Sequence, residues 1–424
     1  MQSLETSPSQ ALRDTARMRL LIITYGTEGD ARPLAALGCA LMRAGHTVHL
    51  LGDADTLDSA RALGVPATAL AGDIRGTLSR MRAMRQIERA LIRIVEARTP
   101  EWMQQATALG AGCDAVIVSG LTAFVGLSVA EALGVPAIGA MMIPISPTAA
   151  FTSPLSPLRL PRVLNRSSHA FVNHMVWRTF RATTNRGRVA IGLPPRKALW
   201  TAHPVLYGVS PALLPDIDDW PPDAIACGQW VPPSTHWTPP QDLVDWIESG
   251  PPPVYAGFGS MSGFDAPRVR DALLAAVGDR RVLFNPGWSG IDISGLPANI
   301  LVIDSVPHDW LLPRCALAIH HGGSGTTHSA CRAGIPSVIL PFAGDQPFWT
   351  GRLRALGIAD RVLSGRRPSA SGLRAAIAFA ERPETRARAA ALGAVMQAED
   401  GCTAAVAWIE RFVAAGGGAT IPSR

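Results

Sequence analysis

The N-terminal half of the chain alternates apolar runs with longer amphipathic stretches. The first apolar run, 18–24, is apolar enough to form a strand buried on both faces. The turn 26–30 follows it, and a helix is expected to begin near Pro33, because proline is favoured at the first helical position. Further strands are predicted at 46–51, 65–70, 114–119 and 135–140, and helices at 74–106 and 122–133. This alternation predicts an α/β domain with a parallel sheet covered by helices on both sides.

The alternation is interrupted between residues 211 and 253, where the chain is rich in proline. Proline favours extended backbone, so the middle of this stretch is interpreted as a linker between two domains. Beyond it the alternation restarts, which predicts a second parallel sheet. Its strands are expected at 254–260, 281–287, 300–304, 316–323 and 337–342, and a final amphipathic helix at 404–415. The predicted division is a flexible tail at 1–17, domains at 18–235 and 236–400, and a C-terminal helix and tail at 401–424.

Composition narrows the class of protein. The 424-residue chain carries a formal charge of +6, but its basic residues are dispersed and only 6% of residues are aromatic, so nucleic-acid binding is not expected. Lys197 is the single lysine, which excludes a Walker A site. Six cysteines lie far apart with no C-x-x-C pair, a pattern typical of reduced thiols. With no run of 18 apolar residues and no secretory-signal pattern in 1–17, a cytoplasmic protein is expected.

The strongest local signal is the segment 316–346, ALAIHHGGSGTTHSACRAGIPSVILPFAGDQ. An apolar strand ends at His320 and His321, glycines turn the chain, and a helix begins near Gly323 or Ser324. The first turn of such a helix has free backbone N–H groups and the positive end of the helix dipole, which together suit a diphosphate. The alternative is an ordinary glycine-rich strand–helix turn.

Other sites are less compatible with this segment. His-Gly-Gly is similar to an oxyanion segment of an α/β-hydrolase, but the G-x-S-x-G motif is absent. A dinucleotide site would need G-x-G-x-x-G after the first strand, which is also absent. The histidines at 320, 321 and 328 have no carboxylate or cysteine at ligand spacing, so no metal site is expected.

The segments SVPHDWLLPR, HHGGSGTTHSACRAGIP and PFAGDQPFW resemble the nucleotide-sugar signature of family 1 glycosyltransferases. GTEGDARP near the N-terminus and GFGSM at 257–261 extend the resemblance to both halves. The residues of these motifs are most similar to those of sterol glucosyltransferases and of bacterial glycopeptide and macrolide glycosyltransferases. The resemblance implies the GT-B fold, in which two Rossmann-like parallel-sheet domains face each other across a cleft. It assigns the acceptor to 18–235 and the nucleotide sugar to 236–400.

The resemblance also implies a donor site in which each matching residue has a role. His321 and the first turn of the following helix would hold the diphosphate, together with Ser260 on the opposite loop. Asp345 and Gln346 would bind the hydroxyls of the sugar. Val306 and His308 would lie at the base or ribose, and Trp288 would stack on the base in place of a tryptophan that plant relatives carry at the position of Ser305. The expected donor-binding residues are Thr27, Ser260, Trp288, Val306, His308, His321, Gly323, Ser324, Gly325, Thr326, Asp345 and Gln346.

Asp30 is the candidate general base, because it lies in a strand-end loop just before a helix, where active sites of parallel sheets form. The helix dipole favours an ionised carboxylate, which could accept the proton of an attacking hydroxyl. The alternative is a plain helix cap. Asp216 and Asp218 have D-x-D spacing but lie in a proline-rich stretch, so they are interpreted as a solvated loop and no metal is expected.

The acceptor pocket is expected to be apolar and adaptable, since methionine and aromatic residues follow the strand that ends near 140. The stretch from about 151 to 180 is interpreted as irregular. The candidates are Met141, Met142, Ile143, Phe151, Phe171 and Met175, and each could instead belong to the core. Residues 75–98 alternate arginine with aliphatic residues, a pattern that fits either peripheral contact with an anionic membrane or a solvated helix face over a core.

Together these observations predict an inverting glycosyltransferase that needs no cofactor besides its sugar nucleotide. The resemblance implies transfer of a hexose, with glucose from UDP-glucose favoured and a dTDP-sugar open, to a hydroxyl of a lipophilic acceptor. Asp30 would act as the base. Two alternatives remain: a sugar-nucleotide epimerase with a similar architecture, and an inactive homologue that binds a nucleotide sugar or assists a partner enzyme.

Overall fold

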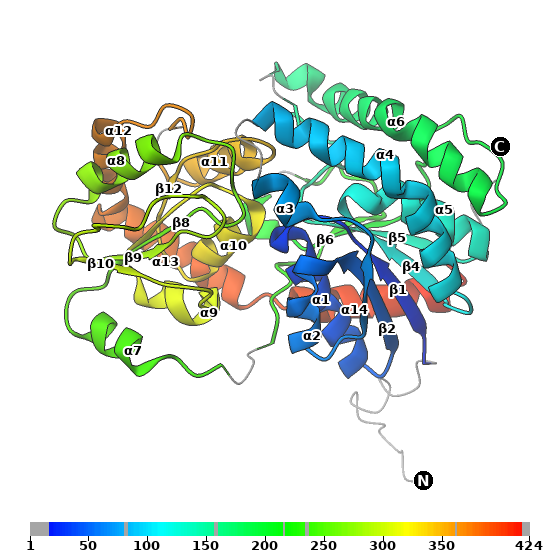
Figure 1. Ribbon diagram of the computed structural model, residues 1–424, viewed down its shortest axis with the longest axis horizontal. Helices are drawn as coiled ribbons and strands as arrows, with labels where there is room; N and C mark the ends of the chain where they lie inside the picture. The colour runs from blue at the N-terminus through cyan, green and yellow to red at the C-terminus, as the bar shows by residue number, and fades with distance from the viewer. Residues whose placement is uncertain are drawn as a thin grey trace, which may run out of the picture.

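The computed structural model describes residues 17–79, 84–156, 160–214, 217–233, 237–360 and 363–417. The predicted tail 1–17, apart from Arg17, lies outside the described residues. The chain forms two α/β lobes, with the N-terminal half at the right and the C-terminal half at the left of Figure 1.

The N-terminal lobe contains a parallel seven-stranded sheet in the order β3-β2-β1-β4-β5-β6-β7. The strands are β1 (Arg19–Ile23), β2 (Thr47–Asp53), β3 (Ala67–Leu70), β4 (Ala115–Val118), β5 (Ala137–Met141), β6 (Val205–Tyr207) and β7 (Ala224–Ala226). The helices are α1 (Glu28–Arg43), α2 (Asp58–Ala62), α3 (Ile74–Ser79), α4 (Met84–Leu109), α5 (Ala123–Leu133) and α6 (Asn165–Ala190). Short 3₁₀ turns lie at Ala54–Thr56, Gly120–Thr122, Arg162–Leu164 and Pro211–Leu213.

The C-terminal lobe contains a parallel five-stranded sheet in the order β10-β9-β8-β11-β12. The strands are β8 (Val254–Gly257), β9 (Val282–Asn285), β10 (Ile300–Val302), β11 (Leu317–His320) and β12 (Ser337–Ile339). The helices are α7 (Gln241–Glu248), α8 (Ala266–Val277), α9 (His308–Leu311), α10 (Ser324–Arg332), α11 (Gln346–Ala355), α12 (Ala370–Ala380) and α13 (Pro383–Gln397), with a 3₁₀ turn at Leu312–Arg314. The last helix, α14 (Gly401–Ala414), belongs to the N-terminal lobe. The two parallel sheets predicted from the alternation are confirmed.

Burial on both faces explains the continuous apolar strands. In β1, Leu20 and Ile22 pack toward α1 and α14, while Leu21 and Ile23 pack toward α4 and α5 on the other face. A parallel sheet covered on both sides needs such runs, because neither face meets water. Among the described residues, no helix is both long and apolar enough to cross a bilayer.

Two sequence interpretations of helices were wrong. The helix expected near Pro33 begins at Glu28, because the Asp30 carboxylate accepts a hydrogen bond from the Thr27 N–H (3.0 Å) and so closes the first turn earlier. The stretch containing Phe171 and Met175, interpreted as irregular, is the 26-residue helix α6. It packs on α4, and Gly187 allows this close approach, because a Cβ there would lie 2.6 Å from the Met103 sulfur.

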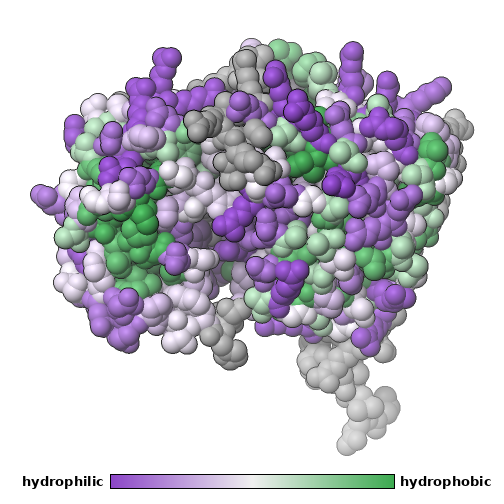
Figure 2. Space-filling view, viewed as in Figure 1, coloured by the Kyte–Doolittle hydropathy of each residue, from purple (hydrophilic) through white to green (hydrophobic). Residues whose placement is uncertain are grey.

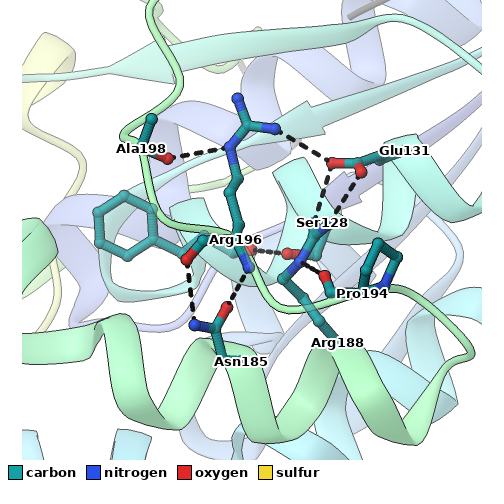
Figure 3. A network of polar contacts seen from close by, with 8 residues as sticks. Ser128, Glu131, Asn185, Arg188, Pro194, Arg196 and Ala198 are labelled. Atoms are coloured by element: carbon teal, nitrogen blue, oxygen red, sulfur yellow. Dashed lines mark hydrogen bonds and ion pairs between the residues drawn. The ribbon is translucent and has the colours of Figure 1, made fainter. Parts of the chain in front are cut away.

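A buried ionic network fixes α6 to the rest of its lobe (Figure 3). The Arg188 guanidinium, whose side chain is 2% exposed, donates two hydrogen bonds of 2.9 Å to Glu131 of α5 and one of 2.9 Å to the Pro194 carbonyl. Arg196 lies 3.7 Å from the same carboxylate and 4.4 Å from the centre of the Trp200 ring. The network therefore joins α5, α6 and the segment that leads to β6.

The chain passes between the lobes twice, and the two passages touch. After β7 it leaves the N-terminal lobe past Gly228, and after α13 it returns past Gly401. Gly228 has a φ of +102°, and a Cβ on Gly401 would lie 2.4 Å from the Gly228 oxygen, so neither position has room for a side chain. The returning helix α14 packs on the core of the N-terminal lobe, where Glu410 lies 2.9 Å from His46.

Candidate functional site

Asp30 lies at the third position of α1, just beyond the carboxyl end of β1. Its Oδ2 accepts the Thr27 N–H, which holds the carboxylate against the turn 26–30. Gly26 makes room for it, since a Cβ there would lie 2.2 Å from Oδ2. Burial raises the pKa of Asp30 to about 6, although hydrogen bonds from Thr27 oppose the shift. The carboxylate is therefore mostly ionised at neutral pH, with a pKa well suited to a general base.

The predicted anion site is the N-terminus of α10, which follows β11 as expected. Gly323 is the N-cap residue, and a Cβ on Gly325 would meet no atom within 4 Å, so a ligand can approach the first turn closely. The side chains of Ser324 and Thr326 are half-buried in this turn. The helix start thus offers free N–H groups beside open space.

His321 precedes this helix and its Nδ1 is buried without a hydrogen-bond partner among the described residues. Gly259, next to Ser260, lies against the ring, because a Cβ on it would be 3.2 Å from the His321 Cε1. This contact brings the loops after β8 and β11 together, as the assignment of Ser260 and His321 to one phosphate site requires. Burial lowers the pKa of His321 to about 4, so its ring is neutral at pH 7.

His320 and His328 have structural roles. His320 Nδ1 accepts the Gly322 N–H (3.1 Å), and the His328 ring contacts the Ser324 carbonyl (2.7 Å) and the Trp349 ring. In the described part of the chain, no group of three or more His, Cys, Asp or Glu side chains is arranged to hold a metal ion. Of the D-x-D candidate, Asp216 lies outside the described residues; its neighbour Asp219 binds Thr148 and the Ala149 N–H.

The turn before α11 carries Asp345 and Gln346. The Asp345 carboxylate accepts a hydrogen bond from Trp349 Nε1 (2.6 Å), and burial raises its pKa to about 6. Gln346 is 6% exposed: its Oε1 accepts the N–H groups of Phe342 (2.7 Å) and Ala343 (3.1 Å), and its Nε2 lies 3.1 Å from the Met261 sulfur. Its amide therefore closes the turn that carries Asp345.

The residues expected at the base lie in two places. His308 begins α9, and its Nε2 lies 3.3 Å from the Tyr255 hydroxyl, while Val306 packs in the same hydrophobic cluster as Tyr255. Burial lowers the pKa of His308 to about 4. Trp288, by contrast, reaches the other lobe, where it packs against the N-terminal core and lies 5.5 Å from the Arg75 guanidinium. Trp288 thus joins the lobes and packs in a different cluster from Val306.

The acceptor candidates are also divided. Met141 ends β5, and Met142 and Ile143 follow it as half-buried residues. Phe151 continues this side of the lobe, and its ring lies 4.9 Å from that of Phe348 in α11 of the other lobe. Phe171 and Met175, however, are 65% and 41% exposed on the outer face of α6. The structure therefore brings Met141 and Phe151 into a cluster shared by the two lobes, packs Met142 against the N-terminal core, and leaves Phe171 and Met175 on the surface.

Two residues of this boundary were not predicted. Arg32 of α1 lies near enough to His308 for its charge to lower the pKa of that ring. Phe348 contacts Phe151 across the boundary. Both lie inside segments that carry the family resemblance, GTEGDARP and GDQPFW, so their motifs were the available signal. Between the lobes the surface is hollowed and largely hydrophilic (Figure 2).

Comparison with known protein families agrees with both halves of this arrangement. Residues 20–152 match the glycosyltransferase family 28 N-terminal domain. Residues 272–411 match the C-terminal domain of proteins like erythromycin biosynthesis protein CIII. Among solved structures, a kitacinnamycin glycotransferase superposes with a TM-score of 0.70 at 20% identity, covering 93% of this chain and 99% of its own. A spinosyn forosaminyltransferase gives 0.69 at 19% identity, with coverage of 94% and 100%. These structures confirm the fold.

Curated relatives match over nearly the whole chain. A sterol 3-beta-glucosyltransferase of Arabidopsis thaliana is 32% identical over 95% of this chain and 69% of its own. The vancomycin aglycone glucosyltransferase of Amycolatopsis orientalis is 33% identical, with coverage of 92% and 96%. The O-mycaminosyltylonolide 6-deoxyallosyltransferase of Streptomyces fradiae is 33% identical, with coverage of 93% and 97%. The chain therefore belongs to the GT-B glycosyltransferase family that includes the sterol glucosyltransferases and the glycopeptide and macrolide glycosyltransferases.

Proposed function

We propose that this protein is an inverting hexosyltransferase that moves a sugar from a nucleoside diphosphate to a hydroxyl of a lipophilic acceptor. The observation that carries the proposal is the juxtaposition of Asp30, from the N-terminal lobe, with Asp345 and the N-terminus of α10, from the C-terminal lobe. Burial raises the pKa of Asp345, the charge on Asp30 adds to the rise, and the Ser324 N–H opposes it, so the three groups lie near one another. A base and an anion-binding helix start are the two parts that glycosyl transfer to a hydroxyl needs.

In the proposed reaction, the Asp30 carboxylate accepts the proton of the acceptor hydroxyl as its oxygen attacks the anomeric carbon. The bond from that carbon to the diphosphate oxygen breaks, and the nucleoside diphosphate leaves with the electron pair. N–H groups of Gly325 and Thr326, the Ser324 hydroxyl and His321 stabilise the negative charge that develops on the leaving group. A single displacement inverts the anomeric centre. Asp345 and Gln346 would orient the hydroxyls of the sugar.

The relatives suggest the substrate classes. Two of the three relatives are named as glucosyltransferases, one for a sterol and one for vancomycin aglycone. The third is named for a macrolide derivative. A neighbouring structure of 20% identity and TM-score 0.64 was solved with dTDP. We therefore propose glucose as the sugar, UDP or dTDP as the nucleotide, and a large, largely apolar acceptor. Met141, Met142, Ile143 and Phe151 would line its site.

We further propose a cytoplasmic enzyme that uses no cofactor besides the sugar nucleotide. The predicted peripheral contact with a membrane falls on the stretch 75–98, of which residues 80–83 lie outside the described part of the chain. Arg89, Arg93 and Arg98 are exposed, but Ile87 and Val95 are buried, and Val95 packs in the core of the lobe. An interfacial helix inserts apolar side chains as well, and Ile87 and Val95 are not available for this.

The test is a nucleotide-release assay with UDP-glucose and dTDP-glucose, run with and without sterol, glycopeptide-aglycone and macrolide acceptors. The proposal expects release that depends on the acceptor, and a product whose anomeric configuration is inverted by NMR. An epimerase would convert the sugar nucleotide without an acceptor. An inactive homologue would bind it, as seen by a raised melting temperature, and release nothing.

A further inference from the structure

The outer face of α6 carries an apolar stripe that exposed arginines interrupt. Phe171, Met175 and Val189 are 65%, 41% and 60% exposed, and Leu164, just before the helix, is 45% exposed. At 100° per residue these four side chains and the exposed Ala182 lie within an arc of about 40° on the face opposite buried Trp177. Large apolar residues scattered over a surface are ordinary, but a stripe along a helix of 26 residues, about 40 Å long, indicates a contact surface.

The same face is positively charged. No Asp or Glu occurs anywhere between Glu131 and Asp216. Arg178 lies at the edge of this arc and Arg181 farther round the helix on the same side, both as exposed residues, and no ion pair involves either of them within the described part of the chain. The basic residues of this acid-free segment are Arg159, Arg162, Arg166, Arg178, Arg181, Arg186, Arg188, Arg196 and Lys197.

The neighbouring helix widens this basic field. Helix α4 packs against α6, and both run along the upper edge of the N-terminal lobe in Figure 1. It exposes Arg89, Arg93 and Arg98, whereas Val95, Trp102 and Met103 are buried in the core. In Figure 2, hydrophilic side chains project from this edge with hydrophobic surface between them. Of the acids near it, Glu131 binds Arg188 and Glu101 binds Arg98, while Glu96 of α4 is exposed among the arginines.

We propose that α6, with the turn before it, docks this enzyme on an anionic lipid bilayer. An exposed apolar stripe flanked by arginines is the pattern of a helix that lies in the membrane interface, with its apolar side chains among the acyl chains and its cations at the head groups. Val163, 86% exposed in the turn Arg162–Leu164, extends the stripe at the start of the helix. A second copy of the chain fits less well, because two such faces would oppose arginine to arginine with no carboxylate from the segment 132–215 to pair them.

Docking through α6 would also place the acceptor side of the site at the lipid surface. His169, in the second turn of α6, lies 3.2 Å from the Ile145 carbonyl and 3.0 Å from the Phe151 carbonyl. The helix thus holds the loop whose Phe151 meets Phe348 at the boundary between the lobes. This step rests on the proposed lipophilic acceptor, whereas the docking surface itself does not.

The experiment is flotation of the full chain with phosphatidylcholine vesicles, with or without about 30% phosphatidylglycerol, at about 0.1 M and 0.5 M salt. The parent should float with the anionic vesicles at low salt and be largely released at high salt. Phe171→Ser with Met175→Ser, and separately Arg178→Glu with Arg181→Glu, should each lower the partition coefficient at least about 10-fold. Ile293→Ser with Val395→Ser removes two equally exposed apolar residues of the C-terminal lobe and should change nothing.

Melting curves and sedimentation velocity of every variant accompany the flotation. A parent chain that ignores anionic vesicles would overturn the proposal, as would α6 variants that bind like the parent or a control pair that loses binding equally. A dimer that the Phe171→Ser, Met175→Ser pair dissociates would assign the stripe to a second copy instead. If that pair does not fold, Val189→Ser at the far end of the stripe replaces it. Because no sugar nucleotide is present, the outcome is independent of the proposed transfer reaction.

Discussion

The carboxylates of Asp30 and Asp345 come from different lobes, yet the charge on Asp30 raises the pKa of Asp345. Burial raises the pKa of each to about 6. One carboxylate follows the first strand of the N-terminal sheet, and the other begins a helix beside the anion-binding end of α10. The relationship joins the proposed base to the proposed sugar site, and the first two predictions depend on it.

Asp30→Asn should abolish most transfer without unfolding the protein. The amide oxygen can still accept the Thr27 N–H, but it cannot take a proton, so turnover should fall by about 10²–10⁴-fold, mainly in kcat. Acceptor-dependent nucleotide release and a melting curve are the measurements. Asp271→Asn, an exposed carboxylate of α8, is the matched control and should keep parental activity. Near-parental turnover in folded Asp30→Asn would exclude Asp30 as the base.

The kcat/KM of sugar transfer should fall as the pH is lowered through about 6. A base must be ionised, and burial raises the pKa of Asp30 to about 6, so kcat/KM should be level above about pH 7 and fall up to tenfold per pH unit below about 5.5. His308 and His321 do not supply this limb, because burial lowers the pKa of each to about 4. The Asp345→Asn variant should still lose kcat/KM at low pH. If kcat/KM of that variant no longer fell below about pH 6, the titrating group would be Asp345 and not Asp30.

His321→Ala should weaken binding of UDP or dTDP by about 5–10-fold, the loss expected when one neutral hydrogen bond is removed. The ring is neutral because burial lowers its pKa to about 4, so a charge-assisted contact is not expected in the free enzyme. Titration calorimetry measures the affinity. His174→Ala, on the exposed face of α6, is the control. An unchanged affinity in His321→Ala would remove this residue from the diphosphate site.

Gln346→Ala should lower stability as well as alter sugar use. Two buried N–H groups, of Phe342 and Ala343, would lose their acceptor, at a cost of about 1–3 kcal/mol for each buried group left unsatisfied. Melting curves and rates with a panel of nucleotide hexoses report the two effects. Gln104→Ala, exposed on α4, should change neither. A variant with parental stability and altered sugar preference would mean that Gln346 acts on the sugar alone.

Arg188→Ala should destabilise the N-terminal lobe by about 3 kcal/mol or more, because Glu131 would lose its main partner in a buried network. The midpoint of urea unfolding is the measurement. Arg178→Ala on the exposed face of the same helix should move the midpoint little, since surface charges contribute about 0–1 kcal/mol. Equal effects of the two substitutions would contradict the structural role of the network.

Local patterns predicted the central strands and the start of helix α10 well. In the run 18–24 both the odd and the even positions are apolar, so both faces of the strand can be buried. A central parallel strand requires this. The Gly-Gly-Ser-Gly turn likewise fixes a helix start, because its glycines leave the first N–H groups open. In both cases residues adjacent in the sequence carry the physical cause.

Where the cause lies in distant residues, the sequence was insufficient. Helix α6 buries small and polar residues such as Thr184 and Gly187 rather than an aliphatic stripe, and only the surface of α4 makes them a packing face. Trp288 fits a base-stacking role by composition, yet it packs against the other lobe. Gln346 belongs to a donor motif, but its amide oxygen is occupied by two N–H groups of its own turn, which leaves only Nε2 for a ligand.

The contact between Gly228 and Gly401 has a consequence for how this enzyme could be recombined. Both passages of the chain lie at one place, and backbone meets backbone there without side chains that must complement one another. A C-terminal lobe from a relative could therefore be spliced in at these two glycines without redesigning that junction. The nearby hydrogen bond from the Ser210 hydroxyl to Glu399 (2.7 Å) marks what such a graft must preserve. The point where the two lobes are joined thus allows exchange of the C-terminal lobe as a unit.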